Sequence, residues 1–96
     1  MPVRYTYSVV MKVVVTKQAL RQVNRAPHHI ATKLWAWVAA VEAQGLEEVR
    51  KVPGFNDHPL KGKRAGERAI RLSYHWRAIY IVEGEVIVVE VHPHAY

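Results

Sequence analysis

The residues of this 96-residue chain that could do chemistry lie in its last third. Arg71 and Arg77 stand in two runs typical of strands, and a histidine and a tyrosine, His94 and Tyr96, close the sequence. Histidine titrates near neutral pH and can serve as an acid or a base. Arginine keeps its charge, and its planar fork matches phosphate oxygens. Such groups at the edge of one small sheet could cleave RNA without a metal.

RNA carries its own nucleophile, the 2′-hydroxyl. Its cleavage needs a base for that hydroxyl, an acid for the 5′-oxygen that leaves, and cations that stabilise the pentacoordinate phosphorane. Preorganised charge is often the largest catalytic contribution, and one donor can contribute roughly 3 kcal/mol. Two arginines and an imidazole are therefore the kinds of side chain that this reaction requires.

A basic stretch surrounds the first of these strands. It contains Lys61, Lys63, Arg64 and Arg68, with Glu67 as an interruption. The whole chain has a formal net charge of +6 and a pI of about 9.9, which suits a polyanionic partner. Contacts from such residues to backbone phosphates would be independent of base sequence. The simpler alternative is a solvated basic loop.

Composition limits the remaining possibilities. A chain of this length forms one domain, residues 1–96, and its hydrophobic fraction of 50% is enough for a packed core. The absence of cysteine excludes disulfides, thiolate chemistry and a cysteine-based zinc site. The apolar run over residues 9–15 is broken by Lys12 and is too short to span a bilayer. We therefore expect a cytoplasmic protein that does not contact a membrane.

The first half predicts a strand followed by two helices. Residues 4–15 are rich in valine and tyrosine, and Thr16 can cap a helix that runs to about Arg25. Pro27 suits the first turn of a second helix, which Gly45 would end. Residues 46–52 add a short helical turn. Apolar residues recur at helical spacing in the second helix: Ile30, Leu34, Val38 and Val41, with Trp37 beside them. Trp35 and Trp37 would point to different sides, so one of them would mark a partner surface.

The second half predicts an antiparallel meander after a loop over residues 53–59. The expected strands cover residues 68–74, 76–82 and 86–91, and Glu83-Gly84-Glu85 is typical of a tight hairpin. The fold class is therefore α+β, with a strand and a two-helix hairpin packed on a small antiparallel sheet. The helices would cover one face, so that Arg71 and Arg77 could project from the other.

An ordered set of segments resembles the RelE/ParE superfamily of bacterial toxins. The segments are Pro59-Leu60-Lys61-Gly62, Gly66, Ile70-Arg71-Leu72, Trp76-Arg77-Ala78-Ile79-Tyr80, Val89-Glu90-Val91 and His94-Ala95-Tyr96. The resemblance is nearest to the RelE/HigB/YoeB-like members, which cleave messenger RNA on the ribosome. The chain departs from their pattern at Glu67-Arg68-Ala69, where an aromatic residue is common, and at Ala95, where an acid is common.

The resemblance implies the toxin of a type II toxin–antitoxin pair, a metal-independent endoribonuclease that acts in the ribosomal A site and needs no cofactor. It implies catalytic roles for Arg71 and Arg77 on the phosphorane, for His94 as acid or base, and for Tyr96 in stacking or proton transfer. The RNA backbone would be held by Lys61, Lys63, Arg64 and Arg68. The implied partners are translated mRNA and a cognate antitoxin, through which the pair would bind operator DNA.

Two other functions share this fold and charge. One is a ParE-like toxin that binds and inhibits DNA gyrase, and the other is an inactive relative that only binds RNA. Single residues also have structural alternatives. Arg71 could pair across strands with Glu90, Arg77 could stack on Trp76 or Tyr80, and His94 could belong to a solvated tail.

Histidine spacing also raises the question of a metal. Glu90, His92 and His94 alternate, which could place zinc ligands on one strand face. Pro93 would disrupt strand pairing between the two histidines, so we expect no metal site. The other histidines, His28, His29, His58 and His75, are interpreted as ordinary surface residues.

Overall fold

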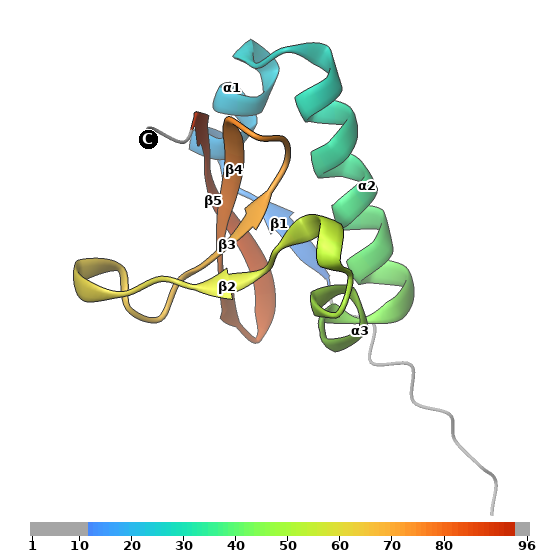
Figure 1. The fold of residues 1–96 in the computed structure, drawn as a ribbon, viewed down its shortest axis with the longest axis vertical. Coiled ribbons are helices and arrows are strands. Elements are labelled where there is room, and N and C mark those ends of the chain that lie inside the picture. Colours follow the sequence, from blue (N-terminus) through green and yellow to red (C-terminus); the bar gives the residue numbers. More distant parts are fainter. Residues whose placement is uncertain (1–11, 94–96) are drawn as a thin grey trace, which may run out of the picture.

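The computed structural model describes residues 12–93, in which helices pack against one face of a twisted sheet (Figure 1). This confirms the predicted α+β fold class. The elements are β1 (Val13–Val15), α1 (Lys17–Arg25), α2 (His28–Gln44), α3 (Leu46–Arg50), the 3-10 turn η1 (Pro53–Phe55), β2 (His58–Pro59), the 3-10 turn η2 (Gly62–Arg64), β3 (Arg68–Arg71), β4 (Trp76–Glu83) and β5 (Glu85–Pro93).

The helix ends follow the sequence signals. Thr16 caps α1, because its Oγ1 accepts a hydrogen bond from the Ala19 backbone N–H at 3.1 Å. Pro27 directly precedes α2 and does not form its first turn. Gly45 ends α2 with a φ of 88°, a backbone conformation that glycine adopts readily and other residues adopt at a cost. The helices that were predicted are therefore confirmed, but α2 begins one residue after Pro27, and α3 ends at Arg50 instead of residue 52.

The apolar face of α2 forms the centre of the core. Ile30, Leu34, Trp37 and Val41 are fully buried there, whereas Trp35 is 42% exposed. The prediction that the two tryptophans point to different sides is thus confirmed. Between residues 12 and 93, the structure has no helix that is both long and apolar enough to cross a membrane.

Five described strands form one sheet in the order β1-β5-β4-β3-β2. The predicted meander is confirmed, since β3, β4 and β5 pair antiparallel. β1 joins β5 in parallel instead, which is possible because a long connection separates the two strands. Only residues 13–15 of the first predicted strand are seen as strand; residues 4–11 lie outside the described part.

The second half differs from the prediction in several details, among them the longer strands β4 and β5. The expected loop contains β2, in which His58 stands opposite Ala69 of β3. β3 ends at Arg71, so the strand predicted to residue 74 is shorter. Pro93 does not interrupt β5, because it is the last residue of that strand, where its missing N–H costs little, and stands opposite Trp76.

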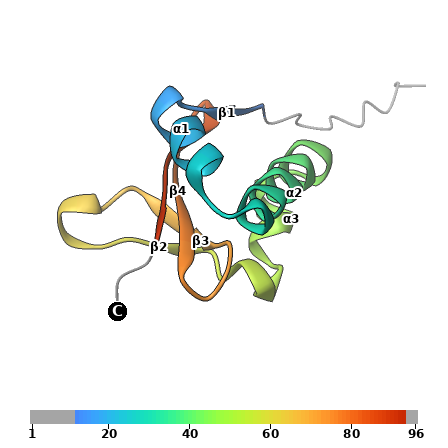
Figure 2. The ribbon, with the colours of Figure 1, turned by 90° about the horizontal axis from the view of Figure 1, so that it is seen from above.

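The two faces of the sheet have different chemistry, because successive side chains of a strand alternate between faces. Tyr80 of β4 lies on the helix-covered face, where its ring packs against Trp37 at a centroid distance of 5.1 Å. On the other face the η2 segment extends away from the sheet, on the side opposite α2 (Figure 2). The face away from α2 is therefore the one on which the predicted site residues can meet a ligand.

Candidate active site

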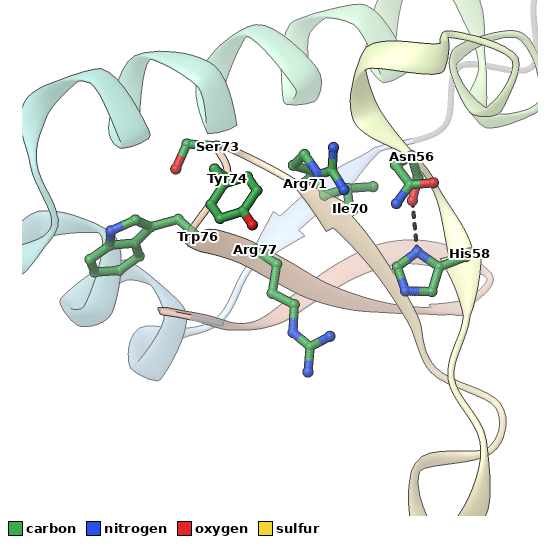
Figure 3. A pocket seen from close by; sticks show the side chains of 8 residues that line it. All are labelled: Asn56, His58, Ile70, Arg71, Ser73, Tyr74, Trp76 and Arg77. Atoms are coloured by element: carbon green, nitrogen blue, oxygen red, sulfur yellow. Dashed lines mark hydrogen bonds between the residues drawn. The ribbon is translucent and has the colours of Figure 1, made fainter. Parts of the chain in front are cut away.

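A pocket lies where β2, β3 and β4 meet the turn between β3 and β4 (Figure 3). Its volume is about 220 Å³, below the roughly 300 Å³ at which pockets for drug-sized molecules begin. Such a pocket suits one group of a polymer better than a whole small ligand. The lining residues are Asn56, His58, Ile70, Arg71, Ser73, Tyr74, Trp76 and Arg77.

Three basic residues occupy neighbouring positions across the sheet next to this pocket. Arg71 of β3 is directly opposite Arg77 of β4, and Arg77 is directly opposite His92 of β5. We call these three residues the cation row. Like charges placed directly opposite each other destabilise a sheet. The row is therefore a place where a bound anion would relieve repulsion.

No carboxylate within residues 12–93 pairs with either arginine of the cation row. The ion pairs of the described residues involve other cations, and the buried Nε of Arg77 has no hydrogen-bond partner among them. The alternative that Arg71 pairs with Glu90 is wrong, because Glu90 binds Arg64. Stacking of Arg77 on Tyr80 is also excluded, because the ring of Tyr80 is buried against Trp37. Neither arginine of the row is thus held by a carboxylate of residues 12–93.

Two histidines, His58 and His92, lie near the arginines, and each contacts a backbone oxygen through its Nδ1 atom. His58 Nδ1 lies 2.7 Å from the backbone oxygen of Asn56, and His92 Nδ1 lies 2.8 Å from that of Pro93. A carbonyl oxygen can only accept, so Nδ1 must be the donor in each contact. In the neutral ring Nε2 then carries the lone pair and can take or return a proton.

Sequence reasoning missed His58. It was interpreted as an ordinary surface residue, yet it lines the pocket together with Arg71 and Arg77. No local pattern marks it, since it lies 13 residues before Arg71 in a segment that looks like a loop. The pairing of the short strand β2 with β3 brings it to the site.

The four predicted RNA-backbone contacts fall into two groups. Lys61 and Lys63 are exposed and have no ion pair within residues 12–93. Arg64 binds the carboxylates of Glu67 and Glu90, and the hydrogen bond to Glu67, followed by that to Glu90, raises its pKa. Arg68 also binds a carboxylate, that of Asp57. RNA contact by all four remains a prediction, and Arg64 and Arg68 would have to exchange a carboxylate for a phosphate.

Arg68 donates from Nε to Asp57 Oδ1 at 2.6 Å, and the Asp57 side chain is only 1% exposed. Burial lowers the pKa of Arg68, but the hydrogen bond and charge of Asp57 outweigh it and raise that pKa overall. Tyr80 donates its hydroxyl to Asp57 Oδ2 at 2.5 Å and accepts from Arg50 Nε at 3.4 Å. Burial, together with the bond to Asp57, raises the pKa of Tyr80 to about 12. This network binds α3, β3 and β4 to the segment before β2.

His94 and Tyr96, which were predicted to be catalytic, lie outside the described residues, so their roles remain predictions. No three metal-binding side chains cluster in the part of the chain that is described. Glu90, one member of the histidine-rich alternation, is bound to Arg64.

The sequence matches no protein-family model and no curated protein. Its fold matches solved structures. A YoeB/ParE toxin from Agrobacterium tumefaciens is 21% identical, with 88% of this chain and 100% of that chain covered and a TM-score of 0.66. YafQ from E. coli strain BL21(DE3) is 17% identical, with 86% and 92% covered and a TM-score of 0.70. YafQ in the E. coli DinJ–YafQ toxin–antitoxin complex is 19% identical, with 88% and 93% covered and a TM-score of 0.70. The chain therefore has the fold of the YoeB, ParE and YafQ toxins, as the resemblance of its second half implied.

Proposed function

We propose that this protein is the toxin of a type II toxin–antitoxin pair and that it cleaves messenger RNA on the ribosome without a metal. The observation that supports this most directly is the cation row, in which Arg71 and Arg77 face each other with no carboxylate from residues 12–93 between them. A structural role for these arginines would call for a counter-charge. A phosphodiester is a ligand that supplies one.

In the proposed reaction, the 2′-oxygen of RNA attacks the adjacent phosphorus while the bond from phosphorus to the 5′-oxygen breaks. One group removes the proton of the 2′-hydroxyl and another protonates the leaving 5′-oxygen, which leaves a cyclic 2′,3′-phosphate and a 5′-hydroxyl. Arg71 and Arg77 stabilise the phosphorane. His58 and His94 are the proposed proton-transfer groups, and Tyr96 stacks on a base or assists the transfer.

The basic segment around η2 would hold the RNA backbone. The exposed side chains of Lys61 and Lys63 contact phosphates as point charges, with Arg64 and Arg68 behind them. Because a free ribonuclease of this kind harms its host, we propose that a cognate antitoxin holds the protein inactive. The likeness to YafQ, which was solved in complex with DinJ, supports such a partner. The pair would act in the cytoplasm and bind operator DNA through the antitoxin.

The test is cleavage in a translating extract. Purified protein is added, and mRNA 5′ ends are mapped by primer extension beside the variants Arg71→Ala and His94→Ala, with Arg21→Ala as the matched control. Arg21 is exposed on α1. We expect new ends within codons that both site variants lose and the control keeps. Intact mRNA in an extract whose protein synthesis continues would contradict the proposal and direct attention to gyrase inhibition or to RNA binding alone.

A further inference from the structure

Asp57 is a buried carboxylate that the proposed reaction does not use. It receives hydrogen bonds from Tyr80 and Arg68, and its side chain is only 1% exposed. Burying a carboxylate costs free energy that even good partners only partly offset, so such a group is not explained by stability alone. Its place in the chain suggests another reason, because Asp57 directly precedes His58.

The segment that presents His58 is held in an unusual conformation. Asn56 has a φ of 45° and a ψ of 48°, and it is the one described residue other than glycine with a positive φ. Residues held in such conformations concentrate at functional sites, where the surrounding contacts keep them in place. Here the Asn56 N–H donates to the oxygen of Pro53 at 3.0 Å, and Asp57 is fixed on the other side.

This conformation sets the state of the imidazole. The backbone oxygen of Asn56 accepts a hydrogen bond from Nδ1 of His58, drawn as the dashed line in Figure 3. If the turn relaxed, that oxygen would move, and His58 would be free to exchange tautomers and rotate. A histidine with the wrong tautomer is a poor proton-transfer group; in a serine protease that fault alone costs about 10⁴-fold in kcat.

We propose that Asp57 is a positioning residue for His58. Its carboxylate, anchored by Tyr80 and Arg68, holds the turn at Asn56 so that His58 keeps its proton on Nδ1 and offers Nε2 to the pocket. This inference rests on the proposed ribonuclease function for its catalytic consequence, but not for its structural content. The orientation and tautomer of His58 can be measured without RNA.

Two substitutions test the proposal. Tyr80→Phe removes one hydroxyl and leaves the ion pair between Asp57 and Arg68, so that the chain should still fold. Asp57→Asn keeps the shape and removes the charge. The control is Glu48→Gln, which breaks the exposed ion pair between Glu48 of α3 and Lys51 and removes none of the hydrogen bonds of the network. Circular dichroism and thermal unfolding establish that each variant is folded.

The first measurement is the pair of imidazole ¹⁵N shifts of His58, assigned by comparison with His58→Gln. We expect Nδ1 to be the protonated nitrogen in the wild type and in Glu48→Gln, and the two variants of the network to show a mixture of tautomers. The second is RNA cleavage, in which both variants should lose at least about tenfold in kcat. In Tyr80→Phe, KM should change less than twofold, because the cation row and the ion pair between Arg68 and Asp57 are both intact.

An unchanged tautomer in both folded variants would overturn the positioning role, whatever the cleavage rate. If Asp57→Asn does not fold, Tyr80→Phe decides the question. If the wild type cleaves no RNA under any condition, the proposed function fails, and the ¹⁵N shifts still decide whether Asp57 positions His58. A tautomer change with normal kcat would show that His58 is positioned but is not used in the reaction, which overturns the catalytic part.

Discussion

Arg71 and Arg77 stand directly opposite each other on β3 and β4, with no carboxylate from the described residues to separate their charges. Two like charges directly opposite each other destabilise an antiparallel sheet. The chain has eight acidic residues, yet Glu67 and Glu90 hold Arg64, and Asp57 holds Arg68 on the helix-covered face. The arrangement keeps two cations open to an external anion.

We expect Arg71→Ala to separate stability from activity. Removing one arginine relieves the repulsion, so the free energy of unfolding should stay the same or rise slightly. Cleavage of mRNA should fall by about 10²–10³-fold, the loss found when one preorganised hydrogen-bond donor to a transition-state oxygen is removed. Single-turnover cleavage and thermal unfolding measure the two effects, with Arg21→Ala as the control. A variant that unfolds more easily in proportion to its lost activity would indicate that Arg71 is structural.

Inorganic phosphate should stabilise the folded protein through the cation row. A ligand that binds only the native state raises the unfolding temperature by mass action. We expect phosphate to raise the Tm of the wild type more than sodium chloride does at equal ionic strength. The double variant Arg71→Ala and Arg77→Ala should show equal responses to the two salts. A phosphate effect that survives in the double variant would place the anion elsewhere.

Substitution of His58 should reduce cleavage without weakening RNA binding. General acid–base catalysis contributes about 10²–10⁴-fold, so His58→Gln should lose activity in that range. His29→Gln is the matched control, because His29 is exposed at the start of α2. Fluorescence anisotropy with a non-cleavable RNA measures affinity, and the cleavage assay measures rate. Full activity of His58→Gln would leave His94 as the acid–base group.

Glu90→Gln should strengthen RNA binding. Glu90 and Glu67 together hold the guanidinium of Arg64, so neutralising one carboxylate frees part of that charge for phosphate. Each additional phosphate contact to single-stranded RNA steepens the slope of log K against log salt by about 0.7. Titrations at several salt concentrations should show this increase for Glu90→Gln and none for Glu48→Gln. An unchanged slope would mean that Arg64 does not reach the RNA.

The pKa of Tyr80 predicts a loss of stability in alkali. Burial and the bond to Asp57 raise that pKa from 10.0 to about 12, so the neutral phenol is favoured in the folded state. The stabilisation is complete below pH 10 and is lost as pH rises toward 12, because the unfolded chain ionises first. A pKa difference of this size corresponds to up to about 3 kcal/mol of unfolding free energy.

Urea unfolding from pH 9 to pH 12 tests this prediction by comparing the wild type with Tyr80→Phe. The difference in unfolding free energy between the two proteins should shrink as pH rises, since phenylalanine cannot ionise. Lysine titration affects both proteins equally and cancels in the difference. A constant difference across the range would show that the hydroxyl of Tyr80 is not held in its neutral form.

Much of the fold could be read from local patterns. Thr16 and Gly45 mark helix ends because a cap and a left-handed residue act on backbone groups only a few residues away. Ile30 and Leu34 lie on the buried face because their spacing matches one helical turn. Gly84 likewise marks the turn between β4 and β5, with a φ of 72°. The short strand β2 has no such signal, since two residues are too few to show the alternation of a strand.

The site depended on contacts between distant residues. The sequence by itself determined that the second half is basic and that arginines stand in two adjacent strands. Only the tertiary structure decided which cations are open to a ligand, because Arg64 and Arg68 are held by Glu90 and Asp57, which are 26 and 11 residues away. Strand register decided that Arg71 faces Arg77 and that His58 joins them, and register depends on the packing of a whole sheet face, which no local pattern encodes.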